Sequence, residues 1–353
     1  TLVVLAKAQE TEDLATPLPT APADEGESSD VIPNSADSNT IQLGDSSAGH
    51  SVTLGDSVSS MKSKLGTPVR IDADVRGFKT YIYNPSNDYI NYLQVYVDND
   101  EVIGFATISG YFAFDSYVKA GATKSELTSN GFSNKIDNDE RGYMKTITAG
   151  SESYNVVVYF DTIKGGDAVD QMTGDAMGIQ VYPSSYTNSQ MFKAGAPYAS
   201  TCDSSGAYYV NEGINYELCE FVNAYRAMKG IDLLSIASEC ESDVEANGIN
   251  LIYYNPAQQG AENASTTSEG SGLSNYSKRI TKALGFACYV TESYTQDDTD
   301  ALDAFKTLLI ESSDDNDTAA KLISYDVQAC IGGFAVKGDT VYIVLDMWGY
   351  KAS

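Results

Sequence analysis

The chain of 353 residues carries 49 acidic side chains against 22 basic ones, which gives a formal net charge of −27, and 42% of its residues are hydrophobic. A charge of this sign repels phosphate backbones and anionic lipid surfaces, so we expect no nucleic acid as a partner. The length allows about two or three domains with cores of their own. After the first few residues, no run is both apolar enough and long enough to cross a bilayer.

Residues 1–50 predict a signal-peptide remnant followed by a disordered acidic tether. The apolar opening TLVVLAKAQ holds Ala6-Lys7-Ala8, which fits the small-x-small pattern of a signal-peptide cleavage site, although an arbitrary boundary would leave the same start. From residue 9 to about residue 50 the chain is rich in Pro, Ser, Thr, Asp and Glu, and it cannot bury enough apolar surface to offset the entropy of ordering. The only histidine of the chain, His50, ends this segment.

Residues 51–185 predict one small α+β domain built from two similar halves. The first half opens with a short helix that Asp56 or Ser57 caps and that Gly66 ends. Its inward side chains are expected to be Val58, Met61 and Leu65. Strands follow in FKTYIYN and in YINYLQVYVDNDEVIGFATIS, where Asp98-Asn99-Asp100 marks a hairpin turn. The second half repeats a helix in VKAGATKSELTSNGF and strands in YMKTITAG, YNVVVYFD and AMGIQVYP.

Residues 186–210 predict a linker, and residues 211–353 predict a second domain. Because the linker offers few apolar side chains to pack across a boundary, we expect the two halves to fold as separate units. The second domain opens with a helix in CEFVNAYRAMKG that ends at Gly230, and a second helix is expected in the segment with Asp243 and Val244. The first helix has a single apolar stripe, formed by Leu218, Phe221, Val222 and Tyr225.

The five cysteines all lie in the C-terminal half, and their odd number leaves at least one unpaired. No C-x-x-C spacing occurs, so the sequence supports neither a zinc ribbon nor a redox motif. Buried free thiols are the default expectation, but an exported chain could hold one or two disulfides, whose pairing the sequence leaves open. The cysteines are Cys202, Cys219, Cys240, Cys288 and Cys330.

Both halves resemble parts of one bacterial family. LGDS…KLGTP and YIYNPSNDYINYLQVYVDNDEVIGF resemble the N-terminal domain that accompanies CAP domains in secreted proteins of Gram-positive bacteria. VNAYRAMKGIDLLSIASECESDVEANG, SNYSKRITKALGF, LDAFKTLLIES, YDVQACIGGFAV and VYIVLDMWG resemble, in this order, the helices and strands of a bacterial CAP domain, the superfamily of cysteine-rich secretory, antigen 5 and pathogenesis-related proteins. The resemblance implies an α+β chain whose residues 211–353 form a CAP-type α-β-α sandwich, in a secreted protein that can associate with the cell wall.

The same resemblance implies a cavity lined by two histidines and two acids, which binds a divalent metal in some members. Both histidines are missing from this chain, whereas Glu292 keeps one of the acids and Asp303 replaces the other. The residues at the cavity positions are Tyr253 or Ile252, Glu292, Asp303, and Asp317 or Asn316. Because imidazole is a preferred zinc ligand, we expect no zinc. Three carboxylates could hold a hard cation such as calcium, but acids at helix starts are stabilising by themselves, and we favour that simpler interpretation.

We therefore assign no catalytic residue, no metal and no cofactor. A Ser-His-Asp or Cys-His arrangement needs an imidazole base, and His50 lies in the predicted tether. The interpretation is a secreted, non-enzymatic extracellular or cell-wall binding module with a wall polymer, a lipid or a peptide as ligand. Two alternatives remain, a calcium-type or carboxylate-based hydrolase at the cavity and a structural component of the wall or spore coat. Trp348 is expected to anchor the core at the end of the last strand.

Overall fold

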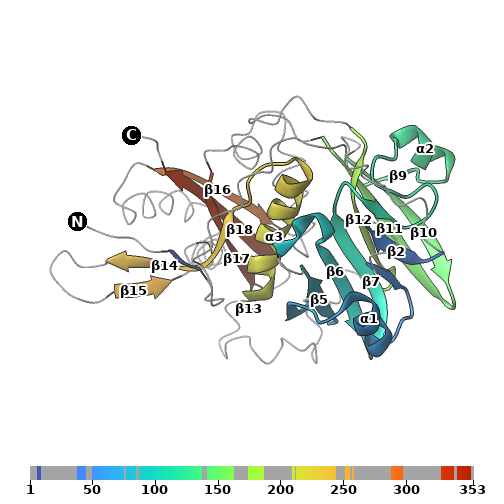
Figure 1. Ribbon diagram of the computed structural model, residues 1–353, viewed down its shortest axis with the longest axis horizontal. Coiled ribbons are helices and arrows are strands. Elements are labelled where there is room, and N and C mark those ends of the chain that lie inside the picture. Colours follow the sequence, from blue (N-terminus) through green and yellow to red (C-terminus); the bar gives the residue numbers. More distant parts are fainter. Residues whose placement is uncertain are drawn as a thin grey trace, which may run out of the picture.

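The computed structural model describes most of the N-terminal half and the central elements of the C-terminal half. The described residues are 6–8, 38–44, 50–74, 77–84, 87–136, 141–162, 174–186, 209–210, 212–243, 251–254, 257, 288–296, 327–337 and 340–350. Within them the fold is α+β, as predicted, with two large sheets and a long helix, α3, between them (Figure 1).

The first large sheet, called the N-terminal sheet, has eight antiparallel strands in two halves, and the strand order of the second half runs opposite to that of the first. Their order is β4 (Arg70–Ala73), β5 (Lys79–Tyr83), β6 (Leu93–Asp98), β7 (Glu101–Ile108), β12 (Ala176–Pro183), β11 (Glu152–Phe160), β10 (Gly142–Ala149) and β9 (Asn134–Lys135). Helix α1 (Val58–Leu65) precedes the first four strands, and α2 (Lys124–Ser129) precedes the other four. The halves meet where β7 pairs with β12, so the predicted helix-and-strand repeat is confirmed.

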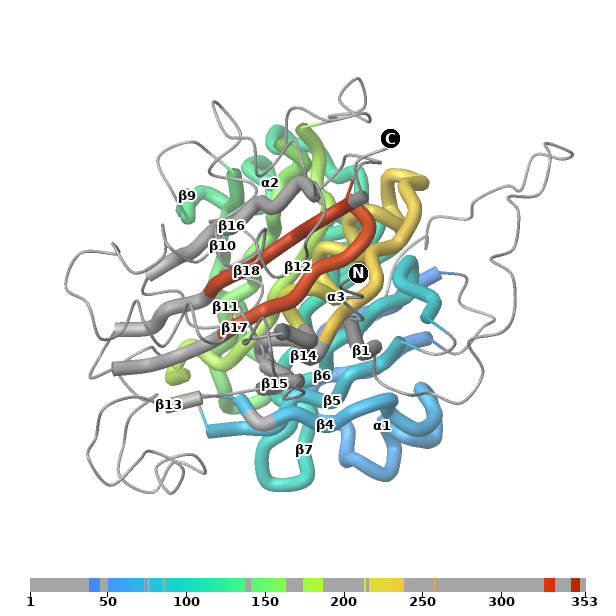
Figure 2. Tube along the Cα trace, turned by 90° about the vertical axis from the view of Figure 1, so that its left-hand side faces the viewer, coloured from blue at the N-terminus to red at the C-terminus, as the bar shows by residue number. Residues whose placement is uncertain are grey.

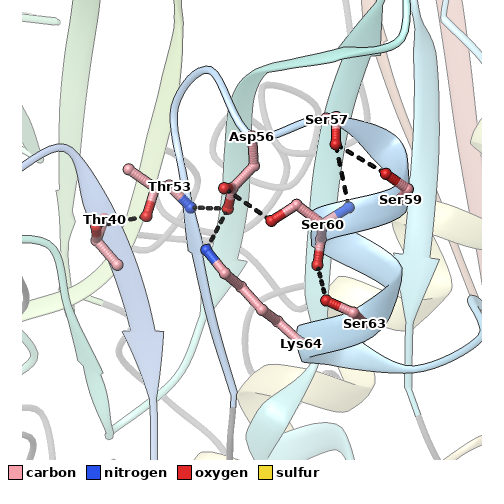
Figure 3. A network of polar contacts seen from close by, with 8 residues as sticks. All are labelled: Thr40, Thr53, Asp56, Ser57, Ser59, Ser60, Ser63 and Lys64. Carbon is pink, nitrogen blue, oxygen red and sulfur yellow. Dashed lines mark hydrogen bonds and ion pairs between the residues drawn. The ribbon is translucent and has the colours of Figure 1, made fainter.

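Local capping explains where α1 begins and ends. The Ser57 hydroxyl accepts a hydrogen bond from the Ser60 amide, and Gly66 ends the helix at a φ of 82° that favours glycine. Asp56 accepts hydrogen bonds from the Thr53 amide, the Ser60 hydroxyl and Lys64 at 2.9, 3.1 and 2.7 Å (Figure 3). The predicted cap and inward face are confirmed, since Met61 is fully buried and Val58 and Leu65 pack against the core.

The hairpin between β6 and β7 is also confirmed. Asn99 and Asp100 have φ values of 48° and 66°, the combination that a two-residue type I′ turn requires. A capping box, in which Thr123 and Glu126 exchange hydrogen bonds, starts α2.

The tether predicted for residues 1–50 is wrong where the structure describes it. Residues Thr40–Leu43 form β2, which lies between β3 (Ser51–Thr53) and β8 (Phe112–Ala113) in a small third sheet. Ile41 and Leu43 are buried in the core of the N-terminal half, so two aliphatic residues in a polar segment suffice when neighbouring strands cover them. Ala6–Ala8, expected at a cleavage site, form β1, which pairs with strand β14 of the C-terminal half.

The second large sheet, called the C-terminal sheet, has the order β1, β14 (Ser235–Asp243), β17 (Ala329–Lys337), β18 (Thr340–Tyr350) and β16 (Cys288–Gln296). Strand β13 (Tyr209–Val210) adds to β17, and β15 (Leu251–Tyr254) adds to β14. The strands predicted in YDVQACIGGFAV and VYIVLDMWG are confirmed, and Trp348 is buried in the core as expected.

Two predictions for this half are wrong. The expected second helix is strand β14, whose first residues pair in parallel with Ala329 and Cys330 of β17; this pairing overrides a weak helical pattern. Tyr209 and Val210, assigned to the linker, also belong to the sheet. Val244 and the helices predicted in SNYSKRITKALGF and LDAFKTLLIES lie outside the described residues, and with them the second helical layer of the predicted sandwich.

Helix α3 (Glu212–Met228) joins the two sheets. Its predicted apolar stripe is buried, Gly230 ends it at a φ of 67°, and every residue from 217 to 226 is buried, including those on the polar side. One hydrophobic core contains α3, Tyr92 and Ala106 of the N-terminal half, and Leu345 and Met347 of the C-terminal sheet. Figure 2 shows α3 behind the C-terminal sheet and in front of the N-terminal one. The premise for separate folding units is therefore wrong, because the helix supplies the apolar contacts that the linker lacks.

Candidate functional site

The structure places three of the six residues named for the cavity positions on strands, namely Ile252, Tyr253 and Glu292. Glu292, expected just after a strand, lies within β16, opposite Asp346 of β18. Tyr253 lies on β15, opposite Glu241 of β14. Asp303, Asn316 and Asp317 lie outside the described residues, so the grouping of the cavity residues stays a prediction.

Asp346 is an acid that the sequence reasoning did not assign to the site. Its neighbours Leu345 and Met347 join the core beside α3, so Asp346 belongs to the other face of the C-terminal sheet. It is fully buried there, in register with Glu292 on one side and Ile331 on the other. We call Glu292 and Asp346 the acid row. The sequence did offer one signal for Asp346, since it is the single charged residue in the otherwise apolar strand VYIVLDMWG. Burying a charge costs free energy, so a charged residue in such a strand indicates a specific role.

A second cluster of charges lies at the junction, the contact between α3 and the N-terminal sheet. Arg70 donates through Nη1 and Nη2 to the two carboxylate oxygens of Glu220, at 2.7 and 2.9 Å, and through Nε to Asp72 at 2.8 Å. Tyr92 donates to Glu220 at 2.9 Å and accepts a hydrogen bond from Gln94. The carboxylates of Asp72 and Glu220 are only 6% and 7% exposed, so this fork of hydrogen bonds fixes α3 in a setting that water hardly screens.

Glu217, one turn earlier on α3, has a raised pKa at the same junction. Burial raises the pKa of its carboxyl well above the usual value, and the negative charge of Asp72 raises it further. A hydrogen bond to Asp72 also favours the protonated form. Burial and the neighbouring Asp72 charge therefore favour the neutral form of the Glu217 carboxyl.

The C-terminal end of α3 is fixed in the same way. Tyr225 donates to Asp161 at 2.9 Å, and Lys229 forms an ion pair with the other oxygen of that carboxylate. Burial first, and then the charge of Asp161, raises the pKa of Tyr225, which keeps its hydroxyl protonated. The hydrogen bonds and ion pairs of these clusters hold α3 in place. Within the described ranges no three side chains of His, Cys, Asp or Glu converge as metal ligands would.

Comparison with known proteins agrees with this architecture. Residues 54–166 match the model of the family described as CAP-associated N-terminal. The chain contains a CAP-associated N-terminal domain. The matched range ends before β12, yet this strand fills the middle of the same sheet, so the domain as folded extends beyond the match.

Most of the chain resembles solved structures of bacterial proteins. The crystal structure of an extracellular protein containing an SCP domain from Bacillus anthracis str. Ames superimposes with a TM-score of 0.56 at 13% identity, over 84% of this chain and 94% of that one. A cysteine-rich secretory protein from Staphylococcus aureus subsp. aureus Mu50 gives a TM-score of 0.49 at 12% identity, over 83% and 92%. No match was found among curated proteins. The first likeness shows that the CAP-associated domain and the C-terminal half together have the fold of an SCP-domain protein.

The described helices include no candidate membrane span. None of them is both long enough and apolar enough to cross a bilayer.

Proposed function

We propose that this chain is a secreted, non-enzymatic binding module that acts outside the cell, at or near the wall. The observation that carries the proposal is the position of the only histidine. His50 lies beside β2 in the N-terminal half, where its backbone carbonyl accepts a hydrogen bond from Leu43. The C-terminal half therefore has no imidazole with which to build a zinc site or a general base at neutral pH. Likeness to the fold of an extracellular protein supports the location.

The acid row is the proposed centre of the ligand site, with Tyr253, Asp303, Asn316 and Asp317 as its proposed surroundings. Strand β16 is the last in the order of the C-terminal sheet, so Glu292 lies at an edge of the described sheet while Asp346 lies inside it. Carboxylates accept hydrogen bonds from hydroxyl and amide groups, which are abundant in wall glycans and their peptides. The net charge of −27 disfavours anionic polymers, so we propose peptidoglycan as the ligand class.

Co-sedimentation with purified Gram-positive peptidoglycan tests the proposal. The full chain should bind saturably, and Glu292→Gln should weaken binding by about tenfold, the loss expected for one charge-assisted hydrogen bond. Glu152→Gln is the matched control, because Glu152 is an exposed acid at the start of β11 in the N-terminal half. No retention of the wild type, or an equal loss in both variants, would show that the acid row does not bind this polymer.

The same assay separates binding from hydrolysis. Opposite residues of an antiparallel pair have Cβ atoms about 4.5–5.5 Å apart, near the roughly 5–5.5 Å between the carboxyl groups of retaining glycosidases. Complete burial of Asp346 argues against this second candidate, because a substrate would have to reach both acids. We also propose that no resident metal is needed, so a chelator should leave binding unchanged. Soluble sugar released by the wild type and lost in Glu292→Gln would make the chain an enzyme.

A further inference from the structure

Two of the five cysteines meet in the core that α3 shares with the C-terminal sheet. Cys219 lies in the middle of α3, Cys330 lies near the start of β17, and both are fully buried. Both belong to the same cluster of buried residues, and the Cys330 thiol is near enough to raise the pKa of the Cys219 thiol. Their elements are packed together, and the residues around them, among them Leu345 and Met347, are apolar. Two neighbouring buried thiols at the interface of a helix and a strand are placed to be joined by one covalent bond.

We propose that Cys219 and Cys330 form a disulfide that ties α3 to β17 in the exported protein. The proposal rests on the export proposed above, because disulfides persist in oxidising compartments outside the cytosol. The oxidant is a disulfide donor, either a dithiol oxidoreductase or a small-molecule disulfide. One cysteine thiolate attacks the donor and releases one donor thiol, and the second thiolate then attacks the mixed disulfide and releases the other. In total the bond between Cys219 and Cys330 forms, the donor disulfide breaks, and two electrons and two protons pass to the donor.

The register of the sheet excludes the other described cysteines as partners of Cys330. Ile236 of β14 lies beside Cys330, which places Cys240 four residues, or roughly 13 Å, further along that strand. Cys288 lies on β16, two strands away across β18, and its row is three residues further along than the Cys330 row. Cys202 lies outside the described residues. Among the cysteines that the structure describes, only Cys219 reaches Cys330 without moving a strand.

The bond has to form before α3 is fully docked. Burial, and then the neighbouring Cys330 thiol, raises the pKa of the Cys219 thiol well above its usual value, so the reactive thiolate is suppressed in the folded chain. Once formed, the bond is shielded from reductants by the same burial. It closes a loop of about 110 residues, and long loops gain the most from closure. The covalent tie would therefore hold the helix that both sheets share.

The test is refolding of the full chain in graded mixtures of oxidised and reduced glutathione. The chain is then alkylated in denaturant, digested and mapped by mass spectrometry. We expect one dominant linked pair, which joins the peptides that carry Cys219 and Cys330. Reduction should lower the thermal midpoint by on the order of 5–10 °C, given the size of the closed loop. Full alkylation of both cysteines in folded protein at the most oxidising ratio, or a link from either one to a different cysteine, would overturn the proposal.

Two variants make the result specific. In a background with Cys202, Cys240 and Cys288 changed to Ser, the linked pair and the redox-dependent midpoint should persist. Adding Cys219→Ala and Cys330→Ala to that background should make the midpoint independent of the glutathione ratio. If the background variant does not fold, the peptide map of the unsubstituted chain decides alone. Peptidoglycan is absent from this experiment, so failure of the disulfide and failure of the proposed function are distinguishable.

Discussion

Replacing Glu220 by Gln should destabilise both halves of the chain together, because it removes the charge that holds Arg70 at the junction. In the structure the Arg70 guanidinium donates hydrogen bonds to both carboxylate oxygens of Glu220 at 2.7 and 2.9 Å, and the hydroxyl of Tyr92 donates a third. The Arg70 side chain is 25% exposed and that of Glu220 is 7% exposed. The pair is therefore mostly desolvated, and the variant leaves a buried cation with Asp72 as its remaining partner.

The magnitude follows from the number of bonds and from their burial. A hydrogen bond to a charged group contributes about 1.5–3 kcal/mol, and removing one partner of a buried pair costs about 3–5 kcal/mol. Gln keeps one oxygen for Tyr92 or Arg70, so we expect Glu220→Gln to cost about 2–3 kcal/mol and Arg70→Met about 3–5 kcal/mol. Because both changes break the same contact, the double variant should lose about 1.5–3 kcal/mol less unfolding free energy than the two single variants lose in sum.

The assay is a double-mutant cycle by urea unfolding, followed by probes in both halves. The matched control is the cycle of Lys64→Met with Asp56→Asn, a pair of similar length at 2.7 Å in which the lysine side chain is 37% exposed. Its coupling should stay below about 1 kcal/mol. A coupling between Arg70 and Glu220 no larger than that of the control, or separate transitions in the two halves, would refute the shared junction.

Three further predictions concern metal and pH. Zinc should not bind stoichiometrically, because carboxylates alone suit harder cations; elemental analysis after zinc is added to metal-free chain checks this, and one tight equivalent lost in Glu292→Gln would contradict it. Burial acts to raise the pKa of Asp56, but hydrogen bonds from Lys64 and the Thr53 amide outweigh it, and the pKa is lowered. The stability that this contributes is present above about pH 4 and is lost as pH falls further, so Asp56→Asn should reduce the acid sensitivity of unfolding. The pKa of Glu217 is raised instead of lowered, so its effect on stability has the opposite dependence on pH. The stability that protonated Glu217 contributes is complete below its usual pKa of 4.5 and is lost as pH rises through the pKa of the folded state. Glu217→Gln should therefore be more stable than the wild type at alkaline pH and similar near pH 4, and a wild-type advantage at alkaline pH would show that Glu217 is ionised in the fold.

Most of the N-terminal half could be predicted because its signals are local. The cap at Ser57, the glycine at the end of α1 and the turn at Asn99 and Asp100 each act within a few residues of their position in the chain. Alternation of apolar and polar residues then fixes the strands between them. Strand β2 was missed for the converse reason. Nothing within the polar stretch before residue 50 indicates that β3 and β8, the second of them about 70 residues later, will cover Ile41 and Leu43.

The junction could not be predicted from the sequence. The periodicity of α3 shows which of its side chains are polar, but not which other elements will bury them. Glu217, Glu220, Asn223 and Arg226 lie outside the apolar stripe of α3 and would suit the exposed side of a surface helix. The structure buries all four. Asn223 accepts a hydrogen bond from the Leu234 amide and donates to its carbonyl, at 2.7 and 2.9 Å, and Arg226 donates to the Asp232 carbonyl. Their partners come from loops and strands whose positions depend on the complete fold.

The position of α3 also limits where a ligand can reach the C-terminal half. The helix covers the face of the C-terminal sheet that carries Cys330, Leu345 and Met347, so that face belongs to the shared core and is closed to solvent. Contact with the acid row must therefore come from the opposite face or from the edge at β16, and Glu292 is the member of the row on that edge strand. Asp346 lies inside the sheet and is fully buried, so the proposed ligand would contact Glu292 and not Asp346. For this reason Glu292→Gln, and not a change at Asp346, separates ligand binding from the stability of the sheet.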